Sequence, residues 1–95
     1  MENDVLIINK RVPVVAVFKD GQEGRSSAYP VKMRYSGREV TFTELGLRHP
    51  TVKGRRMTHV FDMSDGANDY RLEFNAESLC WTLVAVREGR HESRV

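Results

Sequence analysis

The sequence predicts an all-β protein, an antiparallel meander of five to seven strands that forms a small barrel or a strongly bent sheet. Three observations support this prediction. Apolar and polar residues alternate in several short runs, glycine and Asn/Asp separate these runs, and the spacing between turns is eight to twelve residues. Of the 95 residues, 40% are hydrophobic and 29% are charged, which is typical of one folded domain. We expect a single domain over 1–95, with frayed ends at 1–11 and 88–95.

The alternation is clearest in Tyr29–Tyr35, Tyr70–Asn75 and Leu79–Val84. Successive side chains on a strand point to opposite faces, so such runs place one face against a core and the other in water. Aromatic and β-branched residues, which fill these runs, suit a pleated and half-buried surface. The strands are expected at 12–19, 28–35, 39–45, 56–63, 69–75 and 79–87.

One side of these strands defines the expected core. Its members are the apolar residues that share the inward phase of each run. They are Val14, Ala16, Val31, Met33, Val40, Phe42, Phe61, Tyr70, Leu72, Phe74, Trp81 and Leu83.

Turn residues lie between the runs. Asp20-Gly21, Ser36-Gly37 and Asp65-Gly66 contain residues that tolerate the positive φ of tight hairpins. Asn75 is expected to open a turn by bonding to the backbone two residues further on. Thr41 and Glu44 have capping-box spacing, but Val40 and Phe42 already follow period two, so a strand with a bulge at Gly46 is favoured over a helical turn.

The segment Val12–Phe18 is apolar on both faces. Pro13 cannot donate a ladder hydrogen bond, which places its end of the strand at an edge or a start. Two interpretations stay open. In the first, this strand is covered within the monomer, by Val5–Ile8 or by the meander. In the second, another chain pairs with it, and homodimerisation is one form of such pairing. The candidate interface residues are Val12, Val14, Val15 and Val17.

A basic loop is predicted between Leu45 and Phe61, a stretch without any acidic residue. Lys and Arg on an exposed loop can neutralise phosphates and release counterions, the part of nucleic-acid affinity that does not depend on base sequence. Few aromatic residues fall on the exposed side to stack on bases, so a solvated loop or a protein contact is favoured over nucleic acid. The candidate contacts are Arg48, Lys53, Arg55 and Arg56, with Lys32, Arg34 and Arg38 if their face adjoins the loop.

No catalytic, metal or cofactor motif stands out. The acidic turn over 62–69 has the wrong spacing for a calcium loop. His49, His59 and His91 are scattered, and zinc needs three or four closely paired Cys/His ligands. Cys80 stands alone and is expected to be a small packing residue or a partly exposed thiol. We therefore predict a protein that is not an enzyme, with no metal and no cofactor.

The apolar stretches, the first residues and the cysteine content predict the cellular location. The longest apolar stretches, Val5–Ile8 and Val12–Phe18, fall well short of the roughly 18 residues of a membrane helix. The opening Met-Glu-Asn-Asp lacks the basic and apolar regions of a secretory signal. With Cys80 as the only cysteine, a reducing compartment fits, and we expect a cytoplasmic protein that does not act at a membrane.

Several short motifs recur over residues 30–84. Gly37-Arg38 and Gly54-Arg55 precede alternating runs, and Tyr70-Arg-Leu72 and Trp81-Thr-Leu83 follow. This pattern resembles that of small bacterial all-β proteins of unknown function, with a Gly-Arg turn before Tyr-x-Leu and Trp-x-Leu strands. The resemblance implies a β fold and brings no catalytic motif. Two function classes remain as expectations: an accessory or protein-interaction module, and a nucleic-acid-binding small β-barrel.

Overall fold

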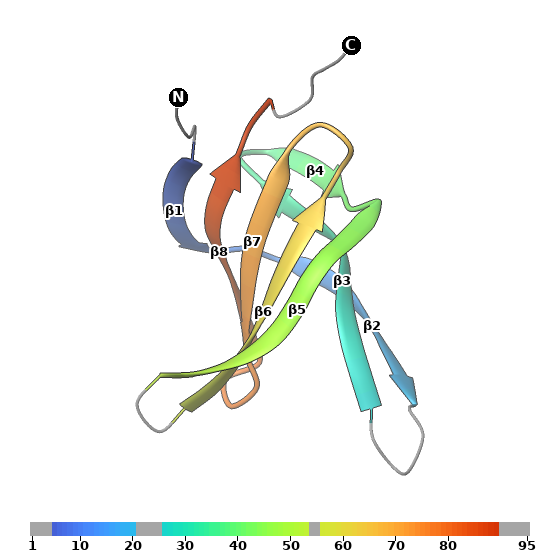
Figure 1. Ribbon diagram of the computed structural model, residues 1–95, viewed down its shortest axis with the longest axis vertical. Coiled ribbons are helices and arrows are strands. Elements are labelled where there is room, and N and C mark those ends of the chain that lie inside the picture. The colour runs from blue at the N-terminus through green and yellow to red at the C-terminus, as the bar shows by residue number, and fades with distance from the viewer. Residues whose placement is uncertain (1–4, 21–25, 54–55, 90–95) are drawn as a thin grey trace.

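The computed structural model describes residues 5–20, 26–53 and 56–89, and these residues form eight strands and no helix. All strand pairs are antiparallel, in a five-stranded sheet of order β1-β8-β7-β6-β5 and a three-stranded sheet of order β2-β3-β4 (Figure 1). The strands are β1 (Val5–Arg11), β2 (Val14–Asp20), β3 (Ser26–Tyr35), β4 (Arg38–Thr41), β5 (Glu44–Lys53), β6 (Arg56–Ser64), β7 (Asp69–Asn75) and β8 (Cys80–Arg87).

The prediction of an all-β antiparallel fold is confirmed, in its form of a strongly bent sheet. The hydrogen-bonded ladders of the described strands divide into two sheets and do not close into one barrel. None of the described residues belongs to a helix with the length and apolar character needed to cross a membrane.

The chain passes from one sheet to the other at two corners. At the first, the Val12 N–H donates to Trp81 O (3.1 Å) in one sheet, and Pro13 O accepts from the Arg34 N–H (3.1 Å) in the other. At the second, the Phe42 N–H donates to Val31 O (2.9 Å) and the Thr43 N–H to Ser64 O (2.7 Å). At each corner, two consecutive residues form backbone hydrogen bonds with different sheets. Each corner therefore holds the two sheets against one core.

These corners explain why there are eight strands rather than five to seven. The strand expected over 39–45 divides at Phe42-Thr43 into β4 and β5. Residues 5–11, expected to be a frayed end, form β1 and pair with β8. This pairing joins the two ends of the described chain, a contact that no local sequence pattern reports.

The predicted turns at Ser36-Gly37 and Asn75 agree with the structure, whereas the turn predicted at Asp20-Gly21 extends into 21–25, outside the described residues. Ser36 and Gly37 have φ of 55° and 74° between β3 and β4, the left-handed conformation expected there. The Asn75 side chain accepts hydrogen bonds from the backbone N–H groups of Glu77 (2.9 Å) and Ser78 (3.1 Å), as predicted. The register of β5 against β6 shifts between Leu45 and Leu47, which confirms the bulge at Gly46.

The predicted basic loop is wrong in its conformation. Residues 48–53 continue β5 beyond the bulge, and Arg56 already begins β6, so a long two-stranded ladder replaces the loop. Only Gly54 and Arg55, which lie outside the described residues, separate the two strands. Period two is hard to recognise here because cations, His49 and Pro50 occupy most positions.

The core between the sheets contains most of the predicted residues. Leu72 and Leu83 have no exposed surface, and Trp81 packs against Phe61 and Phe74 with ring centroids 5.4 and 4.8 Å away. Val14 and Ala16 are only partly buried against this core, and Val31 is partly buried and stands outside it. The buried apolar residues missing from the prediction are Val12, Val60, Met63 and Val86.

The acidic turn between β6 and β7 is held by Asp65. Its carboxylate accepts the N–H groups of Ala67 (2.9 Å) and Asn68 (2.7 Å) and the Tyr70 hydroxyl (2.7 Å). Burial alone would raise the pKa of Asp65, but these hydrogen bonds outweigh it and leave the pKa below its ordinary value. A structural role therefore accounts for this carboxylate.

Candidate functional site

The strand β2 lies at the edge of the three-stranded sheet and pairs only with β3 among the described strands. Pro13 O bonds to β3, and backbone groups of successive residues point to opposite sides of a strand. The N–H and C=O groups of Val14, Ala16 and Phe18 therefore point to the free edge. This edge offers a row of donors and acceptors to an added strand.

Apolar side chains accompany this row. Val15 is 51% exposed and Phe18 is 66% exposed, on opposite faces of β2. Val14 and Ala16 share the face of Phe18 and pack partly against the core. The β2–β3 hairpin extends beyond the body of the molecule (Figure 1). Phe18 therefore lies on the same face of β2 as the core residues, but the opposing sheet does not cover it.

The predicted interface residues therefore divide into two groups. Val15 is exposed and Val17 is half-buried, so both remain accessible on the outer face of β2. Val12 is buried at the first corner, and Val14 is partly buried against the core. The strand is thus covered on one face near its start and open toward its end, and Phe18 is the exposed residue that sequence phase alone did not single out.

Each of the other edge strands carries a feature that hinders pairing. In β1 the register shifts between Ile7 and Lys10, with Asn9 at a φ of 52°. The strand β4 has four residues, two of them charged, and β5 combines the bulge at Gly46 with Pro50. Bulges, short length, charges and proline all protect edges against added strands. In β2, by contrast, Val14–Phe18 has no charge and no proline, and the extra residue of its ladder, Val31, belongs to β3.

A small hollow adjoins the start of this edge on the outer face of the three-stranded sheet. It has a volume of about 190 Å³ and is lined by Val15, Lys32 and Glu39 among others. Lys32 Nζ lies 2.8 Å from Glu39 Oε2, and this hydrogen-bonded pairing lowers the pKa of Glu39. The outer face beside Val15 is therefore a mixture of apolar surface and paired charge.

The candidate basic residues divide between two places. Arg48 and Lys53 lie on β5 and Arg56 on β6, while Arg55 is outside the described residues. The backbone register pairs Lys53 with Arg56 at the described end of this hairpin.

The second group lies far from the first. Lys32 and Arg34 are on the half of β3 that pairs with β4, which carries Arg38 at its start. Figure 1 shows this half at the opposite end of the molecule from the ends of β5 and β6 that carry Lys53 and Arg56. Among the described cations, Lys53 and Arg56 therefore lie apart from Lys32, Arg34 and Arg38.

A groove that the sequence did not suggest lies on the outer face of the five-stranded sheet. It has a volume of about 550 Å³, within the usual range for ligand pockets. Apolar residues of β1 and β8 line one part, including Ile7, which is 69% exposed. Its residues come from β1, β5, β6, β7 and β8, so no local pattern could have predicted it.

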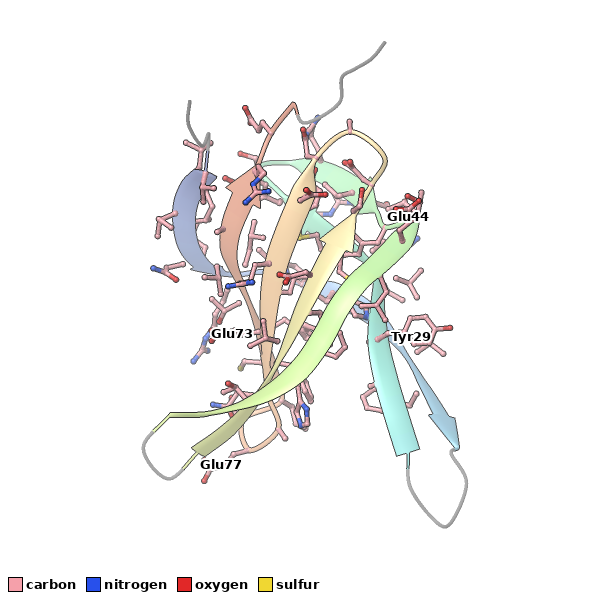
Figure 2. The ribbon with its side chains drawn as sticks, viewed as in Figure 1. Tyr29, Glu44, Glu73 and Glu77 are labelled. Carbon is pink, nitrogen blue, oxygen red and sulfur yellow. The ribbon has the colours of Figure 1, made fainter. Side chains whose placement is uncertain are left out.

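The polar part of the groove is centred on an ion pair. Arg71 donates from Nε to Asp62 Oδ1 (2.8 Å) and from an Nη to Asp62 Oδ2 (3.0 Å), which raises the pKa of Arg71. Figure 2 shows Glu44 at the start of β5, where it lines the groove, and Glu73 further along β7. Acids and guanidinium groups are interspersed here, so the groove has no single charge that would select a ligand.

The remaining candidate side chains are dispersed. Cys80 is partly buried, and its Sγ–H points to Ser78 O at 3.6 Å. His59 is half-buried opposite Phe74, and His91 lies outside the described residues. In the described parts of the chain, no three His, Cys, Asp or Glu residues come together as a metal site would require.

Comparison with protein-family models, with curated proteins and with solved structures finds no match to this chain. The resemblance to small bacterial all-β proteins of unknown function therefore stays a prediction.

Proposed function

We propose that this protein is a non-enzymatic interaction module that binds a protein partner by adding a strand to the free edge of β2. The observation that carries the proposal is the difference between β2 and the other described edge strands. Val14–Phe18 is apolar and has no extra residue of its own, since the bulge of its ladder lies in β3, whereas β1, β4 and β5 carry bulges, charges or proline. We further propose a cytoplasmic location, because Cys80 is the only cysteine.

Strand addition suits the chemistry of this edge. Backbone hydrogen bonds to Val14, Ala16 and Phe18 supply affinity, and alternate side chains of the incoming strand supply specificity. Val15 on one face and Phe18 on the other give that strand apolar contacts on both sides. The partner is therefore expected to present an extended apolar segment.

A photo-crosslinking experiment in cells tests this proposal. A photoreactive residue is placed at Phe18 or Val15, and at Leu79 as a control, because Leu79 is apolar and 71% exposed but lies in the β7–β8 turn. We expect a discrete crosslinked protein species at positions 18 and 15 and not at 79. Adding Ala16→Pro, which removes one outward N–H, should abolish the species.

Two results would overturn the proposal. One is the absence of any discrete species at positions 15 and 18, and the other is equal crosslinking at position 79. Circular dichroism of Ala16→Pro shows whether the variant keeps its β-structure. If it does not, Ala16 can be N-methylated in a synthetic chain, which removes the same N–H without fixing φ.

A second candidate function rests on the basic composition of the β5–β6 hairpin. Arg48 and Lys53 belong to β5 and Arg56 to β6, in a stretch without any acidic residue from Leu45 to Phe61, and such cations can neutralise nucleic-acid phosphates. We propose nucleic-acid binding by the β5–β6 hairpin as the alternative. It uses Arg48, Lys53, Arg55 and Arg56, without Lys32, Arg34 and Arg38.

Titration against single- and double-stranded DNA and RNA at two salt concentrations tests the alternative. We expect binding to weaken as salt rises and to fall in the Arg55→Ala/Arg56→Ala variant. The matched control is Arg34→Ala/Arg38→Ala, which removes the same charge at the other end of the molecule. Equal losses in both variants would contradict a hairpin site, and no binding at low salt would exclude the alternative.

A further inference from the structure

We infer that the strand added to β2 is β2 of a second copy of this chain, antiparallel and related by a two-fold axis at Val17. The inference rests on the proposed function and names its partner. It follows from three properties of β2: which backbone groups face outward, which side chains meet in the full-length register, and where the charges lie.

The backbone fixes which registers are allowed. Outward groups come from the even positions Val14, Ala16 and Phe18, so in a hydrogen-bonded pair an even residue must face an even residue. A two-fold axis at Val17 meets this condition, since position 16 then faces position 18 of the other copy. It is also the register in which the whole strand over 14–20 overlaps its mate.

The side chains are complementary in size in this register. Phe18, the largest side chain of the strand, faces Ala16, its smallest, and does so twice because of the symmetry. Val17 faces Val17 in a non-hydrogen-bonded pair, where Cα atoms are about 4.5 Å apart and side chains are closest. β-Branched pairs at such positions favour association.

The charges of β2 are compatible with the same register. Its charged positions, 19 and 20, stand at its end, so antiparallel pairing places them opposite positions 15 and 14, both valines. No like charges face each other. Pairing would give one six-stranded sheet of order β4-β3-β2-β2-β3-β4 and would cover the exposed edge of each copy.

The symmetry allows a charge-exchange test at Val17. In this register position 17 faces only itself, so Val17→Lys places two cations together and Val17→Asp places two anions together. We expect the dissociation constant of each variant, measured by sedimentation equilibrium, to rise about tenfold or more over that of the unmodified chain. Mixing the two variants should restore association, because Lys then faces Asp.

Disulfide trapping gives a second, independent readout. In a Cys80→Ser background, Val17→Cys should form a covalent dimer under mild oxidation, whereas Thr41→Cys on the other edge of the same sheet should not. Trapping at position 41 instead of 17, or failure of the mixed Lys and Asp variants to associate, would overturn the inference.

The outcomes also separate this inference from the proposed function. If the unmodified chain is a single 10.9 kDa species at all concentrations while positions 15 and 18 crosslink to a different protein, a second copy is excluded and strand addition stands. If the chain is monomeric and these positions crosslink to nothing, both fail. If the crosslinked species has twice the mass of the chain, both are supported.

Discussion

The hairpins β2–β3 and β5–β6 are similar in architecture and opposite in chemistry. Each extends beyond the core and brings an edge strand with it, one to either side in Figure 1. The edge strand β5 is interrupted by the bulge at Gly46 and by Pro50, and it carries Arg48 and Lys53. The edge strand β2 is apolar over Val14–Phe18, and the extra residue of its ladder, Val31, belongs to β3.

This difference separates two exposed edges by their chemistry. A protruding edge strand is an aggregation hazard, and β5 has the devices that reduce it. An edge that lacks these devices and is also apolar would be costly to leave uncovered. The contrast within one small molecule is therefore a stronger argument for binding at β2 than the exposure of Phe18 alone.

The largest expected effect concerns the core that supports both hairpins. Trp81 packs against Phe61 and Phe74, so Trp81→Ala should lower the free energy of unfolding by about 3–5 kcal/mol. Urea unfolding measures this loss, with Leu79→Ala as an exposed control expected to change stability by less than about 0.5 kcal/mol. A loss below about 1 kcal/mol for Trp81→Ala would mean that the hairpins do not share this core.

Loss of a hydrogen bond in the turn held by Asp65 should lower stability only on the side of the molecule that carries β5 and β6. Tyr70→Phe removes the hydrogen bond to Asp65 and should cost about 1 kcal/mol. Hydrogen exchange should become faster at the ends of β6 and β7 and stay unchanged in β2 and β3. Equal acceleration in β2 would show that the two hairpins are not independent.

The lowered pKa of Asp65 makes the stability of the protein depend on pH in a defined direction. The pKa of Asp65 in the folded chain is below its ordinary value of 3.8, so its contribution to stability is fully present above that pH. It is lost as pH falls through the lowered pKa. The stability difference between the wild-type chain and Asp65→Asn should therefore be constant near neutral pH and shrink under acid; a difference that grows under acid would contradict the assignment.

Removing a protective feature from β5 should make this edge strand self-associate more readily, as proposed for β2. Pro50→Val gives β5 the backbone N–H that proline lacks, and proline in a sheet is confined to edge positions whose nitrogen faces solvent. We expect self-association to strengthen by about 1 kcal/mol, the net value of one hydrogen bond. Light scattering over a concentration series measures it, and unchanged association would show that the bulge and the cations suffice to protect β5.

The smallest effects are expected from two exposed ion pairs in different sheets. Asp62–Arg71 joins β6 to β7, and Lys32–Glu39 joins β3 to β4. A double-mutant cycle should give a coupling energy of about 0.2–1 kcal/mol for Asp62–Arg71, and added salt should weaken both pairs. A larger value for Asp62–Arg71 would indicate that the groove around it is less hydrated than the exposure of its residues suggests.

Much of the fold follows from local sequence. Period two placed the strand at 69–75 with its observed bounds, and glycine with Asn/Asp placed the turns at Ser36-Gly37 and Asn75. These features depend on backbone sterics and on side chains a few residues apart, so the sequence by itself determined them.

Other features depended on contacts between distant residues. The pairing of β1 with β8, the corner at Val12 and the burial of Met63 involve partners far apart in the chain. Period two cannot report which face is covered, nor how far along a strand the cover extends. Val14 and Phe18 share one phase, yet the first is partly buried and the second is exposed.

The same limit applies to the candidate site. The sequence by itself determined that Val12–Phe18 is apolar on both faces and that 45–61 has no acid. Only the tertiary structure decided that β2 lies at an edge, that the cations form two separate groups, and that β5 rather than a loop carries one of them. The physical reason is that a strand edge is free or paired according to hydrogen bonds with other segments, which composition does not encode.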